Sequence, residues 1–235
     1  MINLYETKGV KKFTSKNVNK SWDKTRMNLN SRSLVCSPSG GGKTNLLANY
    51  LLRCENTYHK IYICYKESEP IYDWIREQLK DKVEFFTNPS QLPTLEDMRK
   101  DKNGKKIDDE SNILLVIDDW VDQIDKYPSM QDIVIRSRRY LTLIFISQSY
   151  FKIPILYRKN CTYLLLLKLN GVKDAKLVLA DHVIMDIEPE KLLAIYKESV
   201  KEKFNFFKID VNSGDPNKKY SHNFDGFFKL ENDTN

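Results

Sequence analysis

Continuous apolar runs recur along the chain and are separated by polar segments. A run such as Ile113–Ile117 shows no alternation of apolar and polar residues, which is typical of a strand buried on both faces of a parallel sheet. Comparable runs, some of them shorter, occur on either side of it. The predicted strands cover residues 34–36, 60–65, 83–86, 112–117, 141–146, 162–169 and 204–211.

Stretches with helical spacing of their apolar residues lie between these runs. In residues 71–79, for example, the spacing predicts an amphipathic helix. The alternation of strands and helices favours an α/β fold of three layers around a mainly parallel central sheet. The predicted helices cover residues 45–52, 71–79, 95–99, 129–139, 172–181 and 188–201.

One large domain accounts for most of the chain. We place it at residues 31–211, because the predicted strands and helices lie within these bounds. Residues 1–30 carry many lysines with little hydrophobic periodicity, so we interpret them as a basic N-terminal arm. Residues 212–235 are polar with some aromatic residues and are interpreted as a C-terminal tail. A chain of 235 residues can bury a substantial core in one such domain.

Composition indicates a globular protein of moderately basic character. The chain is 41% hydrophobic and 30% charged, with a formal net charge of +6, which suits an anionic partner without identifying one. The longest apolar runs, such as residues 163–167, are far too short for a membrane span, and the N-terminus lacks a signal-peptide pattern. The four cysteines show no paired spacing, which favours reduced thiols in the core and a reducing compartment.

The most informative motif is the glycine-rich loop at Ser37–Thr44, between a predicted strand and a predicted helix. In this arrangement backbone amides and the helix N-terminus converge on phosphate oxygens. Lys43 would reach the β- and γ-phosphates of ATP, and the Thr44 hydroxyl would ligate Mg²⁺. Ser37 stands where the Walker pattern has glycine, and the alternative is an ordinary turn with a solvated lysine. The residues predicted to bind nucleotide are Ser39, Gly40, Gly41, Gly42, Lys43, Thr44 and Asn45.

Polar groups follow two of the predicted buried strands. Asp118 and Asp119 end one of them, and in open α/β sheets ligands collect at the carboxyl ends of strands. If this strand lies beside the loop-bearing strand, Asp118 would hold the metal and Asp119 would activate the attacking water as a general base. Gln148 follows another strand and could bond the γ-phosphate or that water. The alternatives are a turn or helix cap for the aspartates and a satisfied strand-end amide for Gln148.

Three arginines precede the strand that ends at Gln148. Arg136, Arg138 and Arg139 offer the fixed positive fork with which an arginine finger stabilises phosphate charge across a subunit boundary. A solvated helix face or a DNA-contacting patch is the alternative for the same residues. The predicted catalytic residues are Lys43, Asp118, Asp119, Gln148, Arg138 and Arg139, and the predicted metal ligands are Thr44 and Asp118.

These motifs, in this order, resemble the FtsK–HerA superfamily of ring-forming P-loop ATPases. The chain is most similar to the viral branch, the poxvirus-type genome-packaging ATPases of large DNA viruses and their virophage relatives. The resemblance covers residues from about 33 to 170. It rests on residues 37–44, on 117–120, on the arginine-rich stretch before 145–148, and on Ile153-Pro154 followed by 158–160.

The resemblance implies a RecA-like P-loop core that assembles as a homo-oligomeric ring of five or six subunits and uses ATP and Mg²⁺. Such a ring would thread double-stranded DNA into a preformed capsid, with capsid vertex or portal-like proteins as further partners. Lys43, Thr44, Asp118 and Gln148 carry over directly, whereas many superfamily members have glutamate in place of Asp119. The resemblance also implies a location in the host cytoplasm or viral factory, or in the virion.

The sequence allows more than one DNA-contacting surface and more than one type of activity. Basic runs at residues 1–26, 100–106 and 218–219 could line a DNA pore, or could be solvated surface. One rival function is a P-loop nucleotide or nucleoside kinase, which would need an arginine-rich lid and an acceptor pocket. The other is a nucleotide-dependent DNA-binding switch with slow hydrolysis.

Overall fold

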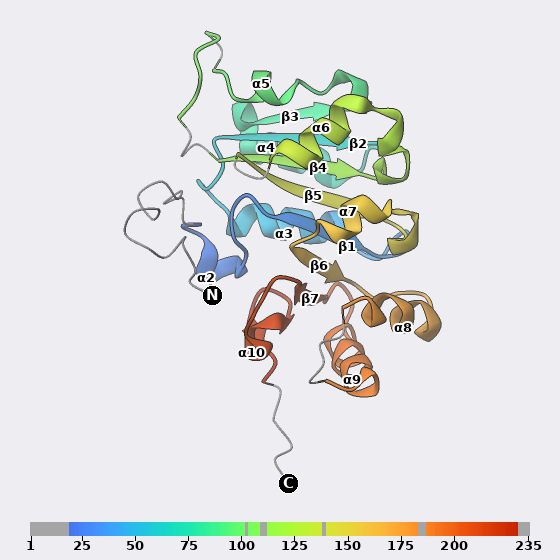
Figure 1. The fold of residues 1–235 in the computed structure, drawn as a ribbon. Helices are drawn as coiled ribbons and strands as arrows, with labels where there is room; N and C mark the ends of the chain where they lie inside the picture. Colours follow the sequence, from blue (N-terminus) through green and yellow to red (C-terminus); the bar gives the residue numbers. More distant parts are fainter. Residues whose placement is uncertain (1–18, 102, 109–111, 138–139, 183–186, 230–235) are drawn as a thin grey trace, which may run out of the picture.

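The computed structural model describes residues 19–229 except 102, 109–111, 138–139 and 183–186, and the remaining residues lie outside the description. The described residues form one nine-stranded sheet with helices on both faces (Figure 1). The strands, in chain order, are β1 Arg32–Cys36, β2 Lys60–Tyr65, β3 Val83–Phe86, β4 Ile113–Asp118, β5 Leu141–Ser147, β6 Tyr163–Leu166, β7 Phe207–Asp210, β8 Tyr220–His222 and β9 Gly226–Phe227.

The spatial order of the strands is β3-β2-β4-β5-β1-β6-β7-β8-β9. The pairs from β3 to β6 are parallel, and the pairs from β6 to β9 are antiparallel. The prediction of an α/β fold with a mainly parallel sheet is confirmed. The strands that carry the loop and Asp118 are not neighbours, as the role given to Asp118 had assumed, because β5 pairs with both β1 and β4 and separates them.

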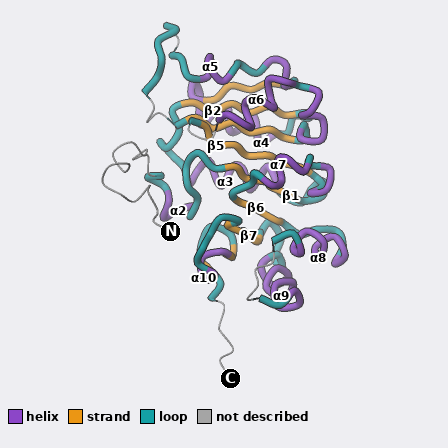
Figure 2. Tube along the Cα trace, in the orientation of Figure 1, coloured by secondary structure: helices purple, strands orange, loops and turns teal. Residues whose placement is uncertain are grey.

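Helices cover the two faces of the sheet (Figure 2). They pack against it through two separate apolar clusters. Within β4, Leu114 and Val116 belong to one cluster, while Ile113, Leu115 and Ile117 belong to the other, because successive side chains of a strand point to opposite faces. Helices α3 and α4 contribute to the first cluster, and α6, α7, α8 and α9 to the second. The three layers that the sequence predicted are therefore present.

The helices begin where their sequences favour a start. Prolines occupy the first position of α4, α6, α9 and α10, where a missing backbone N–H costs no helical hydrogen bond. The helices are α2 Trp22–Thr25, α3 Lys43–Arg53, α4 Pro70–Leu79, α5 Leu95–Met98, α6 Pro128–Arg136, α7 Ile155–Lys159, α8 Val172–Ala180, α9 Pro189–Ser199 and α10 Pro216–Lys219, and the 3₁₀ turns are η2 Lys80–Lys82, η3 Pro89–Gln91, η4 Val121–Lys126 and η6 Tyr150–Lys152.

Segments from both ends of the described chain join this domain. Met27 lies in the apolar cluster with α3, and the buried Lys208 ammonium of β7 donates to the backbone oxygens of Thr25 and Arg26 at 3.1 and 3.0 Å. The last two strands, β8 and β9, extend the sheet beyond residue 211. The division of the chain at residues 30 and 211 stays a prediction, and residues 1–18 and 230–235 lie outside the described part.

All four cysteines are buried and unpaired, as expected for thiols of the core. None of the helices in the described part of the chain has the length and apolar character needed to span a bilayer.

Candidate nucleotide-binding site

The glycine-rich loop connects the end of β1 at Cys36 to the start of α3 at Lys43. Gly40 and Gly42 adopt φ angles of 72° and 95°, in the left-handed region that side chains disfavour. Gly42 is the residue that precedes the helix, so the loop turns directly into the helix N-terminus. The amides of this turn and the positive end of the helix dipole of α3 are arranged to receive an anion.

Ser37, the departure from the Walker pattern, is accommodated beneath the loop. Its side chain is fully buried, and its backbone N–H donates to the Ser147 carbonyl at the end of β5, 3.3 Å away. A Cβ placed on Gly41 would lie 1.7 Å from the Ser37 Oγ. The Ser37 hydroxyl therefore fills the space that a side chain at position 41 would need. A serine at position 37 in this conformation requires glycine at position 41.

Lys43 lies in the first turn of α3 and is 8% exposed. Its ammonium donates to the carbonyl oxygens of Ser37 and Pro38, both at 3.1 Å, so the side chain folds back over the loop. Thr44 is buried beside it, and Asn45 is half-buried. A phosphate oxygen that entered the loop could replace these carbonyls as the partner of the Lys43 ammonium. The phosphate oxygen is negatively charged, so its hydrogen bond to the ammonium would be stronger than that of a neutral carbonyl.

Asp118 ends β4 and is 7% exposed. The Tyr72 hydroxyl, from α4, donates to its Oδ2, whereas Oδ1 is buried without a hydrogen-bond partner among the described residues. Burial raises the pKa of the Asp118 carboxyl to about 6, and the hydrogen bond from Tyr72 and the nearby Lys43 ammonium act in the opposite direction. The site thus contains a buried carboxylate oxygen that no described residue partners.

A hard divalent cation fits that oxygen. Carboxylate and hydroxyl oxygens are the ligands that Mg²⁺ prefers, and it is usually held by one or two carboxylates together with phosphate and water oxygens. In the described part of the chain, no group of three or more His, Cys, Asp or Glu side chains could hold a metal by itself. Asp118 and Thr44 are the residues that fit a cation here, provided that a phosphate ligand supplies further oxygens.

The structure brings Asp119 and Gln148 together. The Gln148 Nε2 donates to the Asp119 Oδ2 at 2.9 Å, and the Asp119 N–H donates to the Ile146 carbonyl of β5 at 3.1 Å. Asp119 adopts a φ of 57°, a left-handed conformation that aspartate tolerates better than most residues. Both side chains line a hollow of about 170 Å³, together with Ser147.

The arginines lie apart from these groups as far as they are described. Arg136 ends α6 just before β5 begins, whereas the loop, Asp118 and Gln148 all follow the ends of parallel strands. Arg136 therefore lies at the N-terminal ends of the parallel strands, away from the loop. There its exposed side chain forms an ion pair with Asp132 at 2.8 Å. Arg138 and Arg139 lie outside the described residues.

The basic runs differ in how far their side chains are accessible. Lys219 is 9% exposed, so it does not present its ammonium to a large anion, and Lys218 pairs with Asp215 at 3.4 Å. Lys100 pairs with Asp97 at 3.0 Å. Lys102 and most of the basic arm lie outside the described residues.

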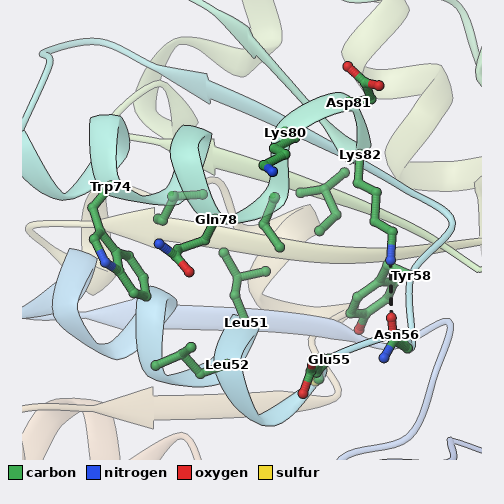
Figure 3. A pocket seen from close by; sticks show the side chains of 14 residues that line it. Leu51, Leu52, Glu55, Asn56, Tyr58, Trp74, Gln78, Lys80, Asp81 and Lys82 are labelled. Carbon is green, nitrogen blue, oxygen red and sulfur yellow. Dashed lines mark hydrogen bonds between the residues drawn. The ribbon is translucent and has the colours of Figure 1, made fainter.

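Two hollows of similar size differ in their relation to the loop. One, of about 510 Å³, lies between α3 and α4 and is lined by residues such as Leu51, Leu52, Trp74 and Gln78 (Figure 3). It contains none of the predicted site residues. The other, of about 430 Å³, lies directly beside the loop and is lined by Pro38–Gly41, residues 168–170 and residues 200–205.

Tyr72 and Phe204 are site residues that the sequence analysis missed. Tyr72 contacts Asp118 across 46 positions of the chain, and the Phe204 ring lies against Gly42. Neither residue belongs to a recognisable motif, and the only local signal is an aromatic side chain near a helix end. Both contacts depend on how distant segments fold over the loop edge of the sheet.

Comparisons with known proteins agree with this architecture. Residues 19–209 match the family described as Poxvirus A32 protein. No protein with a curated description matches the sequence. The resemblance to poxvirus-type packaging ATPases that the sequence predicted is confirmed by the family match.

Solved structures share the fold at low sequence identity. B204, the DNA-packaging ATPase from Sulfolobus turreted icosahedral virus, is 14% identical, with 84% of this chain and 98% of that chain covered and a TM-score of 0.56. The genome-packaging NTPase B204 from Sulfolobus turreted icosahedral virus 2, in complex with ATP-γS, is 14% identical, with coverage of 86% and 100% and a TM-score of 0.55. The cytoplasmic domain of the type VII secretion ATPase EccC from Thermomonospora curvata is 12% identical, with coverage of 84% and 25% and a TM-score of 0.53.

Proposed function

Because this chain belongs to the Poxvirus A32 protein family, we propose that it is an ATPase that moves double-stranded DNA into a preformed viral capsid. The observation that carries the proposal is the meeting of three features at one edge of the sheet. These are a phosphate loop that leads into α3, a buried Asp118 oxygen that has no hydrogen-bond partner in the described part of the chain, and the Gln148–Asp119 pair. The B204 proteins that share the fold are described as packaging NTPases, one of them in complex with ATP-γS, which supports the same use here.

In this proposal the loop amides and Lys43 hold the triphosphate. The Lys43 ammonium exchanges the Ser37 and Pro38 carbonyls for oxygens of the β- and γ-phosphates. Thr44 and Asp118 would hold Mg²⁺, which would supply positive charge to neutralise the phosphates. The Tyr72 hydroxyl donates to the Asp118 Oδ2 and so keeps the carboxylate in place. The Asp118 Oδ1, which has no partner among the described residues, can then bind the cation.

Hydrolysis requires a water molecule that attacks the γ-phosphorus as the bond to the β-phosphate oxygen breaks. Asp119 accepts the proton of this water, and ADP leaves with the bridging oxygen. Gln148 donates to Asp119 and so holds the carboxylate in its orientation. Because Gln148 follows β5, between the loop strand and the Asp118 strand, it is well located to register the loss of the γ-phosphate.

Ring assembly would bring an arginine of a neighbouring subunit to the γ-phosphate, in addition to Lys43 and to Lys66 and Lys152, which line the hollow with Asp119 and Gln148. Arg136 lies at the far edge of its own sheet, so an arginine from this stretch would have to act on a neighbouring subunit. We therefore keep Arg138 and Arg139 as the proposed fingers of a ring of five or six subunits. Capsid vertex or portal-like proteins would be the partners of such a ring, in the host cytoplasm, the viral factory or the virion.

Double-stranded DNA should raise the ATP hydrolysis rate of the purified protein, and ATP should shift its native mass from monomer to ring. The test is a steady-state ATPase assay with and without DNA, run beside a native mass measurement. A protein that stays monomeric and transfers phosphate to a nucleoside or nucleotide would be a kinase. Tight nucleotide-dependent DNA binding with negligible turnover would indicate a DNA-binding switch. Either result would refute the motor.

Tyr72→Phe should raise the Mg²⁺ concentration needed for half-maximal ATP binding by about tenfold. The hydroxyl donates to a buried carboxylate, and a hydrogen bond to a charged group contributes about 1.5–3 kcal/mol. The measurement is ATP binding titrated with Mg²⁺. Tyr65→Phe is the matched control. The Tyr65 and Tyr72 rings stack with their centroids 4.9 Å apart, but it is the Tyr72 hydroxyl that donates to Asp118. Identical Mg²⁺ dependence in Tyr72→Phe and wild type would show that Tyr72 does not position Asp118.

A further inference from the structure

Two hollows at the end of the sheet that carries the phosphate loop lie on opposite sides of the loop strand. The hollow with Asp119 and Gln148 follows the ends of β4 and β5, on one side of β1. The cavity of about 430 Å³ is formed by the loop together with residues 168–170, which follow β6 on the other side of β1. Among the described residues the two hollows share no lining residue. A ligand seated on the loop would therefore have one hollow on each side of the loop strand.

The cavity beside the loop is completed by the segment that joins α9 to β7. Its residues 200–205 face Pro38–Gly41 across the cavity. The volume lies within the range of pockets that bind small molecules. The rim carries polar side chains that include Lys168, Asn170 and Asn205.

Phe204 is the large aromatic side chain that lines this cavity. A Cβ placed on Gly42 would lie 2.5 Å from the Phe204 Cδ1, so the ring edge rests on the glycine that precedes α3. The side chain is nevertheless 46% exposed. One part of the ring therefore contacts the loop while the rest remains accessible.

The backbone holds Phe204 in an unusual conformation. Its φ of 72° lies in the left-handed region, which a bulky side chain rarely adopts. The neighbouring residues are tied to the turn between β8 and β9: the Asn223 Oδ1 accepts from the Phe206 N–H at 2.8 Å, and the Asn223 Nδ2 donates to the Asn205 Oδ1 at 3.0 Å. Strain of this kind persists where the surroundings over-determine it, and it clusters at ligand sites.

We propose that the cavity between the phosphate loop and residues 200–205 binds the nucleoside part of the triphosphate, with the Phe204 ring as the stacking surface for the base. The inference rests on the proposed function, because it needs a nucleotide on the loop. The γ-phosphate and its attacking water belong beside Asp119 and Gln148, so the nucleoside must leave the loop on the opposite side. The cavity and the accessible Phe204 ring lie on that side.

A base can reach the ring without disturbing the fold. The Lys203 ammonium lies 4.8 Å from the centroid of the Phe204 ring, and both side chains are exposed. An exposed cation–π contact is weak, so a base can replace it. Every base has a π-face that can stack on the ring. The subsite would therefore bind a base without distinguishing one base from another by the hydrogen-bonding groups on its edge.

Phe204→Ala should weaken ATP binding by about tenfold and leave the binding of inorganic tripolyphosphate unchanged. Tripolyphosphate carries the phosphates without a base, so it reports on the loop alone. Phe204→Leu should show the same selective loss, because it keeps an apolar contact with Gly42 but has no flat ring. Phe204→Trp should bind ATP as the wild type does. Titration calorimetry with both ligands is the measurement.

Phe151→Ala is the matched control, because Phe151 is also 46% exposed but does not line this cavity. It should leave both affinities unchanged. Equal ATP affinity in wild type, Phe204→Ala and Phe204→Leu would overturn the stacking proposal alone. Parallel loss of ATP and tripolyphosphate binding would also overturn it, since Phe204 would then act through the loop. Failure of the wild type to bind ATP at all would instead refute the proposed function.

Discussion

Lys43→Ala should lower the ATP hydrolysis rate about a hundredfold or more. Lys43 is 8% exposed and lies in the first turn of α3, and its ammonium is bonded only to backbone carbonyls among the contacts described. Removing a positioned donor from the place where charge develops typically slows a reaction about a hundred- to a thousandfold. Loss of the same ammonium should also weaken the binding of ATP and tripolyphosphate together.

The measurement is steady-state phosphate release, with thermal unfolding recorded to verify that the variant is folded. Lys176→Ala, a change of an exposed lysine on α8, is the matched control and should hydrolyse ATP at the wild-type rate. Near-normal turnover in Lys43→Ala would refute the assignment of residues 37–44 as the phosphate loop. The motor, the metal ligands and the nucleoside cavity would then all lose their basis.

Asp119→Asn should leave ATP bound but lower its hydrolysis about a hundredfold or more, since a general base typically contributes a factor of this order. Asparagine has nearly the shape of aspartate but lacks its basicity and its negative charge. It adopts the left-handed conformation as readily as aspartate, and its Oδ1 can accept the hydrogen bond from the Gln148 Nε2. A fall in rate would therefore report the lost proton acceptor and not a displaced loop.

Binding and hydrolysis have to be measured separately for this variant. ATP affinity, taken from calorimetry at a temperature where turnover is slow, should match the wild type. Asp81→Asn, a change of an exposed aspartate in η2, controls for the loss of one negative charge. If Asp119→Asn hydrolyses ATP at the full rate, the proton acceptor lies elsewhere, and the Gln148–Asp119 pair is only a structural contact.

Much of the fold was predictable because its strands are buried on both faces. The runs at residues 113–117 and 141–146 lie within β4 and β5, and the run at 60–65 coincides with β2. Short elements without a periodic signal, such as α7, α10, β8 and β9, were not predicted. These elements are too short to show a period, and β8 and β9 depend on pairing with a strand already in the sheet.

The order of the strands was not predicted. The role given to Asp118 assumed that its strand lies beside the loop strand, whereas β5 lies between them. Sequence order does not set spatial order in a sheet built by crossovers, because each helix can carry the chain past one or more strands. The insertion of β5 is nevertheless what brings Gln148 to within 2.9 Å of Asp119.

The sequence by itself determined the phosphate loop, because its chemistry resides in consecutive residues. The glycines at positions 40 and 42, Lys43 and the start of α3 follow one another, so a local pattern specifies both the turn and the direction of its amides. It also determined that aspartates end a buried strand. Only the tertiary structure decided which side chains meet them: Tyr72 at Asp118, Gln148 at Asp119, and Phe204 at Gly42. Those contacts join separate segments of the chain, and their positions follow from packing across the sheet, for which no short-range pattern exists.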